Sequence, residues 1–168
     1  MWKKILVLVI VLLAVGAGIF FWGMSLSNEP VKVIQAQLAA IDNNDFATAY
    51  GYLAPQIRSD MPLEQYRGFI EQHSALLKGQ HASFPFRQLY WRGGTFVFER
   101  GHMPRLNPAY LTDTLHADRD LNNVALIRGT LVAPSGESTR VRYLLMQEED
   151  VRTGKDHWVI YDFALGKW

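Results

Sequence analysis

The chain of 168 residues contains no cysteine. This absence excludes disulfide bonds, thiolate metal sites and a cysteine nucleophile, and it is compatible with an oxidising compartment. A clear excess of charge is also absent, because 17 lysines and arginines stand against 16 aspartates and glutamates, for a formal net charge of +1. A domain that binds nucleic acid would show a clearly basic surface. Nucleic acid is therefore not an expected partner.

Charged residues are missing altogether between Lys4 and Glu29. Residues 5–26 read ILVLVIVLLAVGAGIFFWGMSL, and a helix needs about 20 such apolar residues to cross the ~30 Å hydrocarbon core of a bilayer. Trp2 and Trp22 lie near the two ends of this run, where amphipathic aromatic rings prefer the headgroup layer. The run therefore predicts a transmembrane helix over residues 5–26.

The flanking charges predict the orientation of this helix. Lys3 and Lys4 directly precede the apolar run, so the positive-inside rule places residues 1–4 in the cytoplasm. Residues 27–30 are then expected to form a short linker. Residues 31–168 would form one folded domain on the other side of the membrane, which is the periplasm if the membrane is a bacterial inner membrane.

A cleaved signal peptide is the alternative interpretation of the same run. Residues 15–17, Val-Gly-Ala, form an acceptable small-residue cleavage site. The apolar run continues to residue 22, however, beyond the usual signal core of about 7–15 residues, so a retained anchor is preferred. Within the span, Ala14 and Gly18 form a small-xxx-small pair, which allows a second transmembrane helix to approach closely.

The first half of the domain has the hydrophobic period of helices. The first apolar stripe ends at the polar turn Asp42-Asn43-Asn44-Asp45. The second ends before Pro55, because a residue that precedes proline avoids the α region, and the third has Pro62 in its first turn, where a missing N–H is tolerated. We therefore expect three amphipathic helices, over residues 31–41, from residue 46 to Pro55, and from about residue 60 to 77.

The second half has the period of strands. Aromatic-rich residues 84–92 and 95–100 flank Gly93-Gly94, a two-residue hairpin signal. Residues 101–123 are irregular, with a short helix at residues 108–115 as one interpretation. Three further strands are expected over residues 124–132, 138–147 and 157–164.

Alternation along the strands at residues 124–132 and 138–147 predicts which side chains share a face. Apolar residues should face the core, and a row of arginines with one threonine should lie on the other face. The expected inward residues are Ala125, Ile127, Leu131, Val141, Tyr143 and Leu145, and the expected outward residues are Arg128, Thr130, Arg140 and Arg142.

Three segments carry a family resemblance: VIQAQLAAIDNNDFATAYGYLAPQIR (residues 33–58), MPLEQYRGFI (residues 61–70) and DHWVIYDFAL (residues 156–165). A first helix, a short polar turn, an F-x-x-A-Y second helix and a closing Trp-Val-Ile strand resemble the nuclear-transport-factor-2-like superfamily, whose cone is shared with ketosteroid isomerase. The resemblance covers most of residues 31–168. It implies an α+β domain with three helices packed on a curved antiparallel sheet. Residues 101–123 depart from the minimal family layout.

The superfamily includes enzymes, binding modules and scaffold subunits, so the resemblance does not select a function. Its isomerase-like enzymes place an acidic base and hydrogen-bond donors in the cavity of the cone. The matching candidates here are the acids Asp42, Asp45 and Asp162 and the donors Tyr50, Tyr90, Tyr143 and Tyr161. None of them stands in a recognisable catalytic motif, and turns, caps and core packing explain them equally well. We therefore expect no catalytic residues and no enzyme activity.

Metal and cofactor sites are not expected either. The histidines lack the i, i+4 and His-x-His spacings that arrange metal ligands, and a His102/His116 pair is the remaining candidate. Ser135-Gly136 is a hairpin turn with no strand-to-helix transition after it, so it is not a nucleophile elbow. The five histidines are His73, His81, His102, His116 and His157.

Contacts with other proteins have more support. Arg128, Arg140 and Arg142 are like charges on neighbouring strands and require an anionic group opposite them. Acidic residues of the domain, an acidic partner and anionic lipid headgroups are all candidates. The segment Tyr90-Trp91-Arg92 has the composition of a binding hot spot, although Trp91 also suits a core.

The expected partner-binding positions lie in the predicted span and on the strands of the domain. They are Ala14, Gly18, Trp22, Tyr90, Trp91, Arg128, Arg140 and Arg142. They predict a non-catalytic accessory or assembly subunit of a bacterial inner-membrane protein complex, with a homodimer as the nearest variant. The alternative is a small-ligand binder or isomerase-like enzyme that uses the cavity of the cone.

Overall fold

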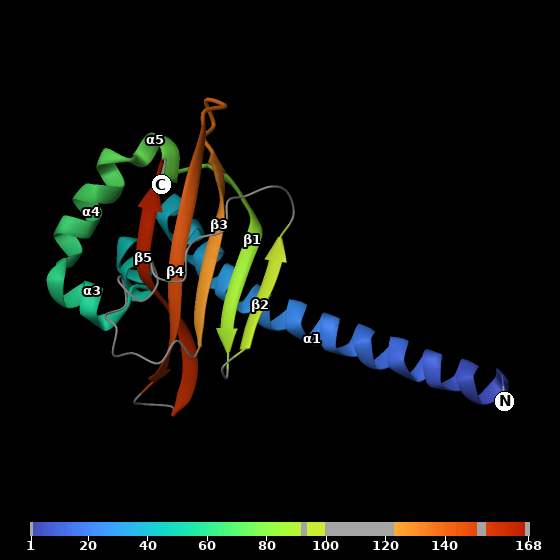
Figure 1. The fold of residues 1–168 in the computed structure, drawn as a ribbon. Coiled ribbons are helices and arrows are strands. Elements are labelled where there is room, and N and C mark those ends of the chain that lie inside the picture. The colour runs from blue at the N-terminus through green and yellow to red at the C-terminus, as the bar shows by residue number, and fades with distance from the viewer. Residues whose placement is uncertain (1, 92–93, 100–122, 151–153, 167–168) are drawn as a thin grey trace.

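The computed structural model describes residues 2–91, 94–99, 123–150 and 154–166. Within these residues, helices occupy the first half of the chain and strands the second, as Figure 1 shows. The predicted α+β class is therefore confirmed. Most of the irregular segment 101–123, with the short helix considered at residues 108–115, lies outside the described residues.

The long first helix differs most from the expectation. Helix α1 runs without a break over Trp2–Asp42, so residues 27–30, expected to be a linker, are helical. Pro30 lies inside this helix although it lacks the N–H that would continue the hydrogen-bond ladder. Pro30 and Val31 are both buried. Packing against the domain therefore holds the helix together where the local sequence favours a break.

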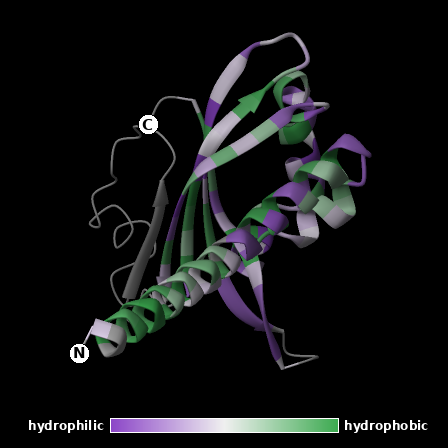
Figure 2. Ribbon diagram, turned by 90° about the vertical axis from the view of Figure 1, so that its right-hand side faces the viewer, coloured by the Kyte–Doolittle hydropathy of each residue, from purple (hydrophilic) through white to green (hydrophobic). Residues whose placement is uncertain are grey.

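The two halves of α1 have different surroundings. The N-terminal half is apolar around the helix (Figure 2) and exposed, with Trp2 at 82% of its full accessible surface. It is the one helix in the described part of the chain that is long and apolar enough to cross a membrane. In the C-terminal half, Ile34, Leu38 and Ile41 repeat at helical spacing and are buried in the main core.

Four short helices follow, and two prolines divide them. Asp45 caps the first, because its Oδ1 accepts a hydrogen bond from the Thr48 N–H at 3.1 Å. Residues that precede proline leave the α region at Ala54 (ψ 147°) and Met61 (ψ 98°), so a short helix lies between them. The predicted third helix begins after Pro62 and is split at His73 (φ −104°, ψ 19°). The extra helical turn between these prolines was not predicted. The helices are α2 (Phe46–Gly51), α3 (Pro55–Asp60), α4 (Leu63–Gln72) and α5 (Ser74–Leu77).

All five predicted strands are present. They form an antiparallel sheet in the order β2-β1-β3-β4-β5. Gly94, predicted to lie in the turn Gly93-Gly94, is instead the first residue of β2 and pairs with Trp91, whereas β3 has the predicted bounds. The strands are β1 (His81–Trp91), β2 (Gly94–Glu99), β3 (Val124–Val132), β4 (Ser138–Asp150) and β5 (Lys155–Leu165).

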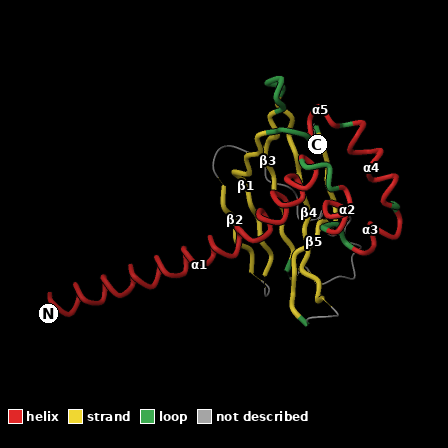
Figure 3. Tube along the Cα trace, turned by 180° about the vertical axis from the view of Figure 1, so that it is seen from behind, coloured by secondary structure: helices red, strands yellow, loops and turns green. Residues whose placement is uncertain are grey.

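The helices cover one face of this sheet (Figure 3), and the main core lies between the two layers. All six inward-facing residues predicted on β3 and β4 belong to this core, so the predicted alternation is confirmed. The opposite face also buries apolar side chains, which form a second cluster. Its buried members are Phe86, Val124, Leu126, Leu144 and Met146.

A glycine allows β1 and β3 to approach closely at an irregularity of their pairing. The register shifts between Ser83 and Phe86, and Gly129 of β3 lies opposite this shift. A Cβ on Gly129 would lie 2.1 Å from the Ser83 carbonyl oxygen and 2.7 Å from Cδ1 of Phe84. Any side chain at residue 129 would therefore push the two strands apart.

We predict that Gly129→Ala destabilises the domain by about 1–3 kcal/mol, the usual cost of overpacking. Gly68→Ala is the matched control, because Gly68 is exposed within α4 and no atom lies within 4 Å of the position that an added Cβ would take. Helix propensity should make that control about 0.5–1 kcal/mol more stable. Urea unfolding of both variants measures the difference, and equal stabilities would contradict the close approach.

Candidate functional site

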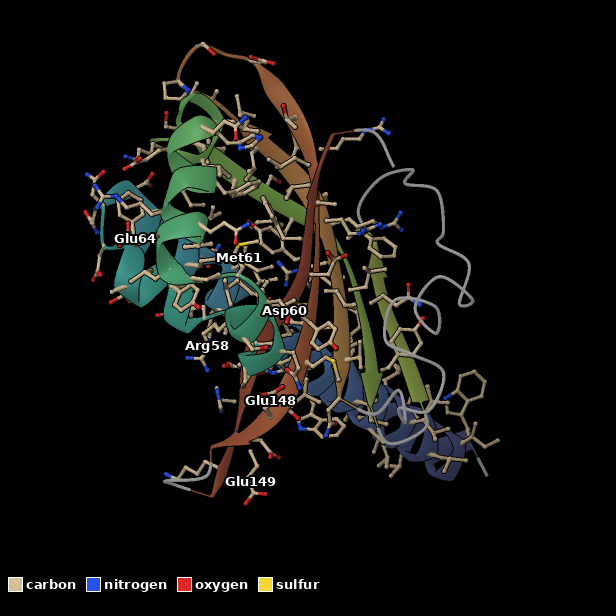
Figure 4. All side chains as sticks on the ribbon, turned by 90° about the vertical axis from the view of Figure 1, so that its left-hand side faces the viewer. Arg58, Asp60, Met61, Glu64, Glu148 and Glu149 are labelled. Carbon is tan, nitrogen blue, oxygen red and sulfur yellow. The ribbon has the colours of Figure 1, made fainter. Side chains whose placement is uncertain are left out.

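A cleft of ≈ 210 Å³ lies between the short helices and strand β5. Most of its lining is apolar, and a carboxylate and two tyrosines supply the polar groups. Figure 4 shows Met61 between α4 and the sheet, whereas Arg58 points away from the sheet. The lining residues are Leu53, Ile57, Met61, Tyr66, Phe69, Ile160, Tyr161, Asp162 and Phe163.

A smaller void of ≈ 30 Å³ lies deeper and shares four lining residues with the cleft. It has room for about one or two water molecules. Gln37 Nε2 donates a hydrogen bond to Tyr66 Oη at 3.2 Å beside this void, and both residues are buried. The cleft therefore continues toward a polar pair in the core. The shared residues are Leu53, Tyr66, Phe69 and Phe163.

Burial keeps the two tyrosines of the void protonated at neutral pH. Desolvation raises the pKa of Tyr66 to about 12, and the hydrogen bond from Gln37 opposes this rise. Desolvation also raises the pKa of the fully buried Tyr143, and the nearby Tyr66 adds to the effect. Both hydroxyls are therefore hydrogen-bond donors rather than bases.

Asp162 is the candidate acid that the structure places at the cleft. Its Oδ2 accepts a hydrogen bond from Nη2 of Arg142 at 3.0 Å, in an ion pair whose arginine is buried and whose aspartate is partly exposed. The ion pair therefore occupies one oxygen of the carboxylate. The geometry therefore suits a polar group at the rim of an apolar cleft.

The predicted arginine face is different in the structure. Arg128 and Arg142 pair across β3 and β4, but their side chains are 0% and 7% exposed, and Arg140 is the exposed member of the three. The guanidinium carbon of Arg128 lies 3.8 Å from the ring centroid of Phe86. The prediction that these arginines form an exposed face for a partner is therefore wrong for Arg128 and Arg142. Alternation along a strand separates its two faces, but it does not show whether a face is exposed to solvent.

The aromatic segment before the hairpin is partly described. Tyr90 packs against the second cluster, its hydroxyl accepts a hydrogen bond from Gln88 Nε2, and partial burial raises its pKa. Trp91 is the last residue of β1. Its side chain, and Arg92 as a whole, lie outside the described residues.

Three other catalytic candidates make structural contacts. Asp42 Oδ1 accepts a hydrogen bond from the Gly79 N–H at 2.6 Å, and Asp45 caps α2. The Tyr50 hydroxyl lies 2.8 Å from the Arg58 carbonyl oxygen and 2.9 Å from that of Met61. These contacts support the turn, cap and packing interpretations.

The histidines do not converge in the described part of the chain. His73 Nδ1 lies 2.9 Å from the Phe69 carbonyl oxygen at the end of α4, and His81 and His157 are exposed. His102 and His116 lie outside the described residues. Among residues 2–91, 94–99, 123–150 and 154–166, no group of three or more histidine or acidic side chains could hold a metal ion.

The unbroken α1 fixes which side of the span faces the domain. Gly23 and Pro30 are buried and Leu26 packs against the main core, so this face continues back to Gly16 at helical spacing. Ala14 and Gly18 lie on the other side, because two residues correspond to about 200° around a helix. Neither Gly16 nor Gly18 has an atom within 4 Å of an added Cβ.

A groove lies along the side of α1 that carries Ala14 and Gly18. Ser25 and Glu29 extend the Ala14/Gly18 face at helical spacing, and the groove, of ≈ 380 Å³, begins at Glu29. Trp22, which is exposed, flanks the same face. The groove is lined by Glu29, Lys32, Val33 and Ala36 of α1 and by Tyr52, Asp156, His157 and Trp158.

The raised pKa values predict a loss of stability in alkaline solution. An unfolded tyrosine ionises near pH 10, whereas Tyr66 retains its proton to about pH 12. The unfolded state therefore binds fewer protons in this window, and stability falls as pH rises, by up to about 1.4 kcal/mol per pH unit for each such tyrosine. Below pH 10 this contribution is fully present.

Tyr66→Phe should flatten this loss, because one of the two buried hydroxyls is removed. Urea unfolding of the original chain and of the variant, repeated between pH 10 and 12, measures the change. A stability difference between the two proteins that stays constant across this window would contradict the burial of the Tyr66 hydroxyl.

The comparison with protein families gives one match over part of the chain. Residues 26–99 match the model of a family described as "Domain of unknown function (DUF4864)". This segment runs from the end of the apolar run through α5 to the hairpin of β1 and β2. No curated protein and no solved structure matches the chain.

Proposed function

We propose that this chain is a single-pass membrane protein that acts as a non-catalytic accessory or assembly subunit of a bacterial inner-membrane protein complex. Its domain is a nuclear-transport-factor-2-like cone on the periplasmic side. The observation that carries the proposal is the unbroken helix Trp2–Asp42, whose first half is exposed and apolar and whose second half is buried in the domain core.

This continuity supports a role at a fixed place on the membrane. Contacts with the core begin at Leu26, the last residue of the apolar run. Since a helix rises about 1.5 Å per residue, the domain starts directly at the bilayer surface. An enzyme that ranges freely from its anchor would need a flexible linker. A rigid connection instead suits a subunit that must keep one orientation toward a neighbour.

The outward side of α1 is the proposed contact. In the bilayer, Ala14 and Gly18 leave room for a second helix, which belongs to an integral membrane protein or to a second copy of the chain. Above the bilayer, the groove beside Lys32 and Trp158 continues the same side of the helix. Lipid covers the remaining surface of the span. Of the three arginines predicted to contact a partner, the burial of Arg128 and Arg142 leaves Arg140 exposed.

The cone assignment rests on the layer arrangement. Short helices and the second half of α1 cover one face of a five-stranded antiparallel sheet (Figure 3). The segments that resemble the superfamily form α1 to α4 and β5. A cleft between the helices and the sheet is the expected position of the cavity of a cone.

The topology has a direct test. A reporter that is active only in the periplasm, fused after Trp168, should be active, because Lys3 and Lys4 orient the helix with residues 1–4 in the cytoplasm. The matched control is the same fusion to a variant with Lys3→Glu and Lys4→Glu, which should lose reporter activity as the bias is removed. Activity of a cytoplasm-only reporter in the original chain would overturn the topology.

Gly18→Leu should weaken the recovery of co-purifying membrane proteins after mild detergent extraction, because it fills the outward side of the span. We expect about a tenfold loss for about 1.4 kcal/mol of lost helix packing. Gly16→Leu is the matched control, since it adds the same side chain on the side that faces the domain. Equal recovery from both variants, or a monomer without partners from the original chain, would contradict the proposal.

Ligand binding is the second candidate function. The ≈ 210 Å³ cleft favours it, because an apolar lining with a few polar groups is typical of small-molecule sites. Asp162 and Tyr66 would orient a ligand inside it. Catalysis has less support, because the carboxylate of Asp162 is paired with Arg142 and the Tyr50 hydroxyl contacts backbone carbonyls.

A further inference from the structure

Helix α3 is attached to the domain differently from the other helices. None of its residues is buried, and it makes no extensive contact with any described helix or strand. Pro55 starts the helix and Pro62 follows its C-cap, so an extended residue stands at each end. A helix of one or two turns that packs on the core only through the half-buried Ile57 has little tertiary packing to hold it in place.

The chain before α3 is fixed to the sheet. The Ala54 N–H donates to the Ile160 carbonyl oxygen at 2.8 Å, and the Ile160 N–H donates to the Tyr52 carbonyl oxygen at 2.8 Å. This pair of hydrogen bonds holds Leu53 beside β5 in a parallel bridge. Movement of α3 would therefore begin after Ala54, at the proline.

One side chain holds the other end of α3. The Tyr50 hydroxyl lies within hydrogen-bonding distance of two backbone carbonyl oxygens, those of Arg58 in the last turn and of Met61 at the C-cap. It has one proton to donate, so the two carbonyls share it. The Tyr50 ring packs on Tyr66 at 5.7 Å between centroids. Tyr50 therefore connects the free end of α3 to the floor of the cleft.

The inner side of α3 forms one wall of the cleft. Ile57 of the helix and Met61 after it line the cavity and pack against the main core, whereas Arg58 points outward (Figure 4). The volume of this partly open cleft, ≈ 210 Å³, is smaller than the roughly 300–1,000 Å³ of most ligand pockets. A ligand of ordinary size would need this helix to move.

We infer that α3 is a lid over a binding site for small apolar molecules, and that the Tyr50 hydroxyl is its latch. The inference rests on the second candidate function, ligand binding in the cleft. The lid lies on the side of the domain away from the N-terminal end of α1 (Figure 1). The ligand therefore arrives from the aqueous compartment rather than from the bilayer.

The absence of cysteine allows a direct test, because an introduced thiol is the single thiol of the full chain. Ile57→Cys reports on the inner side of the lid, and Met61→Cys is a second reporter should the first fold poorly. Ser59→Cys reports on the exposed outer side. Each is made with and without Tyr50→Phe, and the rate of reaction with N-ethylmaleimide is measured in detergent micelles.

Loss of the latch should raise the reaction rate at residue 57 or 61 by roughly two- to tenfold, the change in equilibrium for one lost hydrogen bond. The rate at residue 59 should not change. Tyr52→Phe is the matched control, since Tyr52 meets β5 through its backbone carbonyl. Equal rates with and without Tyr50→Phe, or an equal rise at residue 59, would overturn the lid.

A separate measurement tests the binding site itself. Indole, a small aromatic molecule, should protect the thiol at residue 57 in a saturable manner and leave the thiol at residue 59 unprotected. Protection at neither position would remove ligand binding as a function of the cleft. If Tyr50→Phe raises the reaction rate but indole gives no protection, the movement of α3 is supported and ligand binding in the cleft is contradicted.

Discussion

The continuity of α1 through Pro30 is the constraint on which the rest of the structure depends. A proline inside a helix costs about 3 kcal/mol or more, because it removes one hydrogen bond and its ring crowds the preceding turn. Ile34, Leu38 and Ile41 are almost completely buried in the domain core, and each such side chain contributes about 1.5–3 kcal/mol. Packing of the domain on the helix therefore outweighs the local preference for a break, and it sets the position and rotation of the domain relative to the apolar half of α1.

Burial on both faces of the sheet is the second constraint. A sheet with one solvent-exposed face would place Arg128 and Arg142 in solvent. Here the face of the sheet opposite the helices carries the second apolar cluster, which includes Phe86 and Leu144. Arg128 remains compatible with burial because a guanidinium stacks on an aromatic face, and Arg142 because Asp162 pairs with it. The arginines thus connect the strands within the domain, and any partner contacts the domain elsewhere.

The sequence was sufficient for features that depend on periodicity. Residues 124–132 lie between the turn residues Asn123 and Pro134, and every second residue of a strand faces the same side, so the bounds of β3 and its inward side chains followed from the sequence. It was insufficient where tertiary packing opposes a local signal. Pro30 suggested a linker that packing makes helical, and Pro55 suggested only an end although it also starts α3. The cleft joins residues about 100 positions apart, such as Ile57 and Asp162, and no local pattern predicts that meeting.

Stability is distributed unevenly between the two ends of the helical layer. At one end, α1 contacts β1, β2, β3 and β5, so it moves with the sheet as one body. At the other end, α3 has no fully buried residue, and it is held by the half-buried Ile57 and by the hydroxyl of Tyr50. Segments with few buried contacts open at a lower free energy than the core does. The fold therefore allows the cleft to open without disturbing the anchor, because the two depend on different contacts. The proposed membrane subunit and the proposed ligand site are therefore compatible within one fold, because they use opposite sides of the domain.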